Sequence, residues 1–134
     1  MADAAAEQRF PIRLAQHHRL HLALRGMIAG HAFMALASDH LTVRAGSWYL
    51  DVTLAEVISA DVVEPEDGSI GVHHHRHGRW SIAGDTGRAV LRLKLDQSTT
   101  CRIPAVAVLD IGLEAPHECL DQLLALRPDL ERRQ

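Results

Sequence analysis

The stretch that most constrains the fold is residues 78–95, which read GRWSIAGDTGRAVLRLKL. Apolar residues alternate with other residues on both sides of a short segment, Gly84-Asp85-Thr86-Gly87. Alternation with a period of two is typical of a half-buried strand, and glycines supply the positive φ angles that a tight reversal needs. The sequence therefore predicts a β-hairpin here, with one face on a core and the other facing water or a ligand.

Period-two alternation recurs along most of the chain. An edge strand is expected over residues 10–14, because Pro11 cannot donate a hydrogen bond to a neighbouring strand. Residues 20–24 fit a second strand, but a helix that continues through Ala32 is the alternative. The other expected strands are a hairpin over residues 32–45, a strand over 48–54 with the cleanest alternation in the chain, a strand over 56–63 and a last strand over 103–113.

The spacing becomes helical after Pro116, a residue that suits the first position of a helix. Glu118 lies in the first turn, where the helix dipole favours an anion, and Pro128 ends the segment. The apolar residues of one helical face are Cys119, Leu120, Leu123 and Leu124. The chain therefore predicts a mainly β fold with one C-terminal helix and without repeating β–α–β units.

The length of 134 residues suits one domain with a real core and is too short for two ordinary domains. Residues 1–134 are expected to form a single domain, with flexible ends at residues 1–9 and 128–134. The longest apolar stretch, residues 20–37, contains Arg25 and histidines, so it does not supply the roughly 20 nearly uninterrupted apolar residues of a membrane span.

The net charge of −3 makes nucleic acid an unexpected partner. Cys101 and Cys119 form no C-x-x-C pattern, and residues 1–10 lack the apolar run of a secretory signal. These observations favour a reduced, cytoplasmic location.

Several blocks of sequence form a recognisable set: Ala32-Phe33-Met34-Ala35-Leu36, residues 39–46, Trp48, residues 54–57, residues 87–93, and residues 109–116 running into residues 120–126. Together they resemble a group of small bacterial, mostly actinobacterial, proteins of unknown function. The resemblance covers about residues 10–127. It implies a pleckstrin-homology-like half-barrel of about seven antiparallel strands in two bent sheets, with a C-terminal helix at one end. It implies no catalytic residues, and Ala115 stands where the family's pattern has a capping Asp.

The most conspicuous chemistry is the run His73-His74-His75-Arg76-His77. In a strand, His73, His75 and His77 would project from one face, where imidazoles bind Zn²⁺, Ni²⁺ or Cu²⁺. A solvated loop before the hairpin is the alternative. Zinc is thus a possible metal, although no cofactor is required by the sequence.

Two smaller groups of residues are weaker candidates for a metal site. His17 and His21 would share a helical face, and His117 with Cys101 and Cys119 would form a site only if the last strand and the helix bring them together. The alternatives are a polar surface for the histidines and a buried apolar position for Cys119.

A third candidate site is basic. Arg88, Arg92 and Lys94 fall on the face of the expected strand opposite its leucines, and Arg79 lies across the expected hairpin. Guanidinium groups bind carboxylate and phosphate well, so these four residues form a candidate surface for an anion or a partner. A solvated sheet face is the alternative.

The sequence contains no phosphate-binding glycine loop, nucleophile elbow or spaced pair of carboxylates. We therefore expect a non-catalytic binding or adaptor domain that acts through a protein partner or a homo-oligomer, by strand addition at an edge or in a groove beside the last helix. The alternative is a metal-binding protein that uses residues 73–77 as a sensor, carrier or small hydrolase. A subunit that completes a larger assembly is a third possibility.

Overall fold

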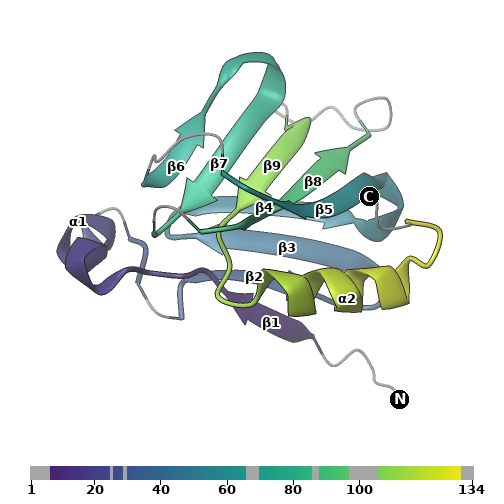
Figure 1. Ribbon diagram of the computed structural model, residues 1–134, viewed down its shortest axis with the longest axis horizontal. Coiled ribbons are helices and arrows are strands. Elements are labelled where there is room, and N and C mark those ends of the chain that lie inside the picture. Colours follow the sequence, from purple (N-terminus) through teal and green to yellow (C-terminus); the bar gives the residue numbers. More distant parts are fainter. Residues whose placement is uncertain are drawn as a thin grey trace.

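The computed structural model describes residues 7–24, 26–28, 30–65, 70–85, 88–96 and 106–130. Within these ranges the fold is mainly β, with two sheets and one C-terminal helix that lies against the second sheet (Figure 1). The first sheet contains β1 (Gln8–Pro11), β2 (Ala32–Leu36), β3 (His40–Ala45) and β4 (Trp48–Thr53), in that order and all antiparallel. The hairpin over residues 32–45 and the strand that follows it are confirmed. An edge strand is also present, but it covers Gln8–Pro11 and not the predicted residues 10–14.

The second sheet differs from the prediction. It contains β5 (Val57–Val63), β6 (Gly71–His74), β7 (Arg79–Ala83), β8 (Val90–Leu95) and β9 (Val108–Ile111), in the order β5-β8-β9-β7-β6. The predicted hairpin between the two halves of residues 78–95 is wrong, because β9 lies between β7 and β8 and hydrogen-bonds to both. β9 runs parallel to β7, so the strands are not all antiparallel as predicted. The described residues form nine strands, whereas about seven were predicted.

Burial explains why β9 occupies the middle of the sheet. Leu109 and Ile111 are completely buried, and a central strand gives such residues neighbours on both sides. Thr86 and Gly87 of the predicted turn and residues 103–105 of the predicted last strand lie outside the described residues.

The segment over residues 20–24 is helical, so the strand prediction is wrong. The alternative is right about the helix but wrong about its extent, because the helix does not continue through Ala32, which begins β2. A short 3₁₀ turn, η1 (Gln16–His18), leads into α1 (Arg19–Ala23). Only Leu22 of α1 is buried, whereas Leu20 and Leu24 are exposed. The amides of Leu24 and Met27 donate to the carbonyl oxygens of Leu20 and Leu22 within this segment, which pairs with no described strand.

The C-terminal helix is α2 (Pro116–Leu126), as the sequence predicts. Proline begins it, Ala115 provides no side-chain cap, and Cys119, Leu120 and Leu123 are buried. Arg127 then ties the helix end to the start of β5 by donating hydrogen bonds to the carbonyl oxygens of Leu54 and Val57. None of the helices in the described parts of the chain is long and apolar enough to cross a membrane.

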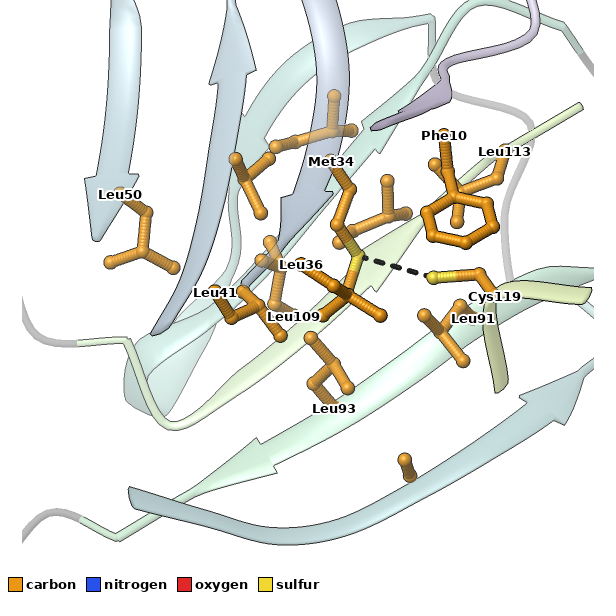
Figure 2. Close-up of a cluster of buried hydrophobic side chains, with 14 of the residues drawn as sticks. Phe10, Met34, Leu36, Leu41, Leu50, Leu91, Leu93, Leu109, Leu113 and Cys119 are labelled. Carbon is orange, nitrogen blue, oxygen red and sulfur yellow. Dashed lines mark hydrogen bonds between the residues drawn. The ribbon is translucent and has the colours of Figure 1, made fainter. Parts of the chain in front are cut away.

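One core lies between the two sheets and α2 (Figure 2). Met34 and Leu36 from the first sheet meet Leu93 and Leu109 from the second. Cys119 of α2 lies with its sulfur 3.8 Å from that of Met34, and burial raises the pKa of its thiol to about 12. The thiol therefore stays protonated at neutral pH and behaves as a small apolar group. Cys101, the other cysteine of the predicted metal alternative, lies outside the described residues.

The segment that follows β1 crosses from the first sheet to the second. The amide of Arg13 donates to the carbonyl oxygen of Gly112 at 2.9 Å, and the amide of Ala15 donates to that of Gly84 at 2.7 Å. Ile12 also forms a bridge with Leu113. This crossing joins the two sheets near one end of β7.

Candidate ligand-binding site

The second sheet presents a row of polar side chains on the face away from the core. Residues opposite one another on paired strands project to the same face, and the register places Asp61, Arg92, Asp110, Ser81 and His73 in line across the five strands. The residues at alternate positions, such as Leu91, Leu93, Leu109 and Ile82, are completely buried. The row therefore follows from the period-two pattern of the strands, with polar residues outward.

Arg92 and Asp110 form the centre of this row. The Nε and Nη2 atoms of Arg92 donate to the two carboxylate oxygens of Asp110 at 2.8 and 3.0 Å. Their side chains are only 20% and 13% exposed. A bidentate pair of this kind neutralises the carboxylate and fixes both side chains.

Replacing Arg92 with methionine should lower the free energy of unfolding by about 2 kcal/mol, because Asp110 would lose two charge-assisted hydrogen bonds in a poorly hydrated place. Urea denaturation would measure the change. Lys94→Met is the matched control on the same strand face: Lys94 is exposed, so we expect a change within about 0.5 kcal/mol. Equal destabilisation of the two variants would contradict the role given to the pair.

A cavity of about 400 Å³ opens beside this row. Its polar wall comes from the loop between β6 and β7 and from the outward positions of β7 and β9, and its apolar wall includes Pro65 and Val90. The polar lining residues are His75, Arg76, His77, Arg79, Ser81 and Asp110. Because Arg92 neutralises Asp110, the lining is basic on balance.

The structure distributes the predicted metal ligands over different environments. β6 ends at His74, and His77 has a positive φ of 61° within the 3₁₀ turn η3 (Arg76–Gly78), so strand alternation does not continue through residues 73–77. His73 Nε2 lies 2.7 Å from the carbonyl oxygen of Ile70, whereas His75 and His77 line the cavity. No group of three or more His, Cys, Asp or Glu residues with metal-binding geometry occurs in the described ranges.

The predicted anion surface is also divided. Arg79 lines the cavity, Arg92 is paired with Asp110, and Arg88 lies with its Nε atom 3.7 Å from an oxygen of Asp85. Lys94 is exposed on β8, and Val108 of β9 separates it from Arg79. Of the four predicted residues, only Arg79 lines this cavity. Arg76 and Ser81 were missed as site residues, because the sequence does not show that the loop and β9 meet here.

His75 and Ser81 are in hydrogen-bonding contact, with His75 Nε2 3.0 Å from Ser81 Oγ. An imidazole beside a hydroxyl can act as a base toward it. In a Ser-His-Asp arrangement the carboxylate would orient the imidazole, but here both oxygens of Asp110 are bound by Arg92. The geometry is better suited to donating hydrogen bonds to a bound anion than to activating a nucleophile.

A second hollow lies beside the end of α2, where the sequence predicts a groove. It is an open groove of about 470 Å³, lined by Ser38, Asp39, Thr53, Leu54, Ala55, Leu126 and Arg127. Beside it, Asp39 and His40 form an exposed ion pair with a 2.8 Å contact between Oδ1 and Nδ1. The lining is less basic than that of the 400 Å³ cavity.

The ion pair gives a pH-dependent signature. The hydrogen bond that His40 donates to the carboxylate of Asp39 raises the pKa of His40, and the same bond lowers the pKa of Asp39. The attraction is lost as pH rises through the pKa of His40 and as pH falls through the pKa of Asp39, so it is complete only between the two values. In an NMR titration, His40 should titrate above its ordinary value of about 6.5 and move toward it in Asp39→Asn. Identical titration of His40 in both proteins would contradict the pairing.

No family model, curated protein or solved structure matches this chain.

Proposed function

We propose that the protein is a non-catalytic binding domain that acts through a protein partner or a second copy of the chain. We further propose that the cavity beside β7 and β9 receives an acidic group of that partner, either a side-chain carboxylate or a C-terminal carboxylate. The single observation that carries the proposal is the basic lining of this cavity beside an aspartate that is already neutralised. A carboxylate entering it would meet donors and no uncompensated negative charge from Asp110.

Three features support binding of an anion. Arg76 and His77 are exposed at the cavity, so they can change partners at low cost. Ser81 supplies a hydroxyl on a rigid strand, next to His75. The planar guanidinium group of Arg79 adds fork-shaped donors that match a carboxylate.

Two further proposals complete this assignment. We propose a pleckstrin-homology-like half-barrel as the fold family, supported by two sheets with a shared core and a terminal helix, although the parallel pair of β7 and β9 departs from an all-antiparallel pattern. We propose a cytoplasmic location, which the sequence favours and with which the free, buried thiol of Cys119 agrees.

The test is an NMR titration of the protein with a short peptide rich in glutamate, compared with the same peptide carrying glutamine and an amidated C-terminus, which has no carboxylate. The glutamate peptide should shift the amide signals of Arg76, His77 and Ser81, and Arg76→Glu should weaken binding by about tenfold or more. Arg44→Glu is the matched control, because Arg44 is an exposed arginine on the first sheet. Equal shifts with both peptides, or shifts that lie away from the cavity, would refute the assignment.

A further inference from the structure

The short helix α1 presents an apolar surface that the core does not use. Leu20 and Leu24, one helical turn apart, are 77% and 81% exposed, and Ile28 beyond the helix is 45% exposed. We refer to these three residues as the apolar tip. On the inner side, Leu22 and Met27 are buried, and the amide of Met27 donates to the carbonyl oxygen of Leu22 at 2.9 Å. Leu22 and Met27 therefore anchor the segment that carries the apolar tip to the core.

The apolar tip lies on a convex part of the molecule. Figure 1 shows α1 at one end of the structure, beyond the ends of the strands and on the opposite side from the C-terminus of α2. Scattered exposed leucines are ordinary on protein surfaces, but two leucines exposed by more than three quarters on one short helix form a patch. Such a patch is costly in water and indicates that something covers it.

The sequence around the tip has one sign of charge. No Asp or Glu occurs between Glu7 and Asp39, whereas the same stretch contains four arginines and four histidines: Arg9, Arg13, Arg19, Arg25, His17, His18, His21 and His31. The whole chain carries a net charge of −3, so this segment is locally opposite to the rest. In the structure, Arg19, His17 and His21 are exposed beside the tip. Its complement is an anionic surface, and two copies of the tip would repel each other.

We propose that the apolar tip docks the protein on an anionic lipid surface, with Leu20 and Leu24 inserted among the acyl chains next to the headgroups and Arg19 at headgroup level. Leucines beside basic residues on a short helix are suited to the bilayer interface. A fluid interface can accept a convex tip without a preformed pocket, whereas an acidic protein would have to provide a cavity of matching shape. This docking does not depend on the carboxylate cavity, which is lined by other elements.

The test is co-sedimentation of the protein, at neutral pH and low salt, with vesicles of phosphatidylcholine alone or of phosphatidylcholine mixed with phosphatidylglycerol. Wild-type protein should bind the mixed vesicles, bind phosphatidylcholine more weakly and dissociate as salt is added. Leu20→Ser with Leu24→Ser should weaken binding to the mixed vesicles by at least about tenfold. Ile58→Ser is the matched control, because Ile58 is 57% exposed on β5 and should not affect binding.

A fluorescent variant gives an independent readout. Compared with wild-type protein, whose emission comes from Trp48 and Trp80, Leu24→Trp should show an additional blue-shifted emission with the mixed vesicles, as its ring enters the interface. Unchanged binding of the double serine variant, equal binding to both vesicle types, or no binding of wild-type protein to either would overturn the proposal. If vesicles do not bind and the serine variant instead loses an acidic protein partner, the tip is a protein-docking surface and the lipid assignment fails.

Discussion

Replacing Leu109 with alanine is expected to lower the free energy of unfolding by about 3 kcal/mol, with denaturation in urea as the measurement. Leu109 is completely buried at the centre of the second sheet, opposite Trp80 on β7 and Leu93 on β8. Figure 2 shows its side chain among Leu36, Leu41 and Leu93. A cavity left there cannot collapse easily, because strands on both sides hold the backbone in place.

Val108→Ala is the control for this prediction. Val108 is the neighbouring residue of β9, it is half-buried, and it projects to the opposite face. Its truncation should cost no more than about 1 kcal/mol. A slip of β9 by one residue would exchange the two faces, so a larger loss for Val108→Ala than for Leu109→Ala would show that the register is wrong.

Local signals in the sequence were sufficient for much of the fold. The hairpin of β2 and β3, strand β4 and helix α2 are each specified by alternation, turn residues or helical spacing within a few positions. β4 ends at Thr53, one residue before the predicted end, because Thr53 and Glu56 form a capping box that begins the 3₁₀ turn η2 (Leu54–Glu56). These elements could be predicted because their closest partners are near in sequence.

The position of β9 could not be predicted in this way. Residues 78–95 contain a plausible turn between two alternating runs, but both runs pair with β9, which follows them in sequence and carries the completely buried Leu109 and Ile111. Pairing between strands that are far apart in sequence depends on the packing of the whole core and gives no local signal in the sequence. The error mattered for the site, because the pairing of β7 with β9 is what places Ser81 beside Asp110.

The prediction of a strand over residues 20–24 was wrong for a different reason. Leu20, Leu22 and Leu24 alternate, as in a half-buried strand, but a strand would need all three on one covered face. In the helix only Leu22 is covered, and the exposure of the other two is what suggests a separate docking surface.

Replacing Gly84 with alanine is expected to be at least as damaging as the loss of Leu109, lowering the free energy of unfolding by about 3 kcal/mol. A Cβ atom at this position would lie 2.3 Å from the carbonyl oxygen of Arg13 and 3.1 Å from the Cα atom of Leu14. Both are backbone atoms of the segment that joins the two sheets, so no side chain can rotate to relieve the contact. The crossing would have to move away from β7 and would lose the 2.7 Å hydrogen bond from Ala15.

Gly112→Ala separates this steric effect from a general intolerance of alanine near the crossing. Gly112 accepts a hydrogen bond from the amide of Arg13, but a Cβ atom on it would meet Ala83 at an ordinary 3.6 Å. Its substitution should change the free energy of unfolding by less than about 1 kcal/mol in the same urea measurement. If both variants were equally stable, the close approach of residues 13–14 to β7 would be wrong. The crossing would then join the two sheets through its contacts with Gly112 and Leu113, and not through a fixed contact at Gly84.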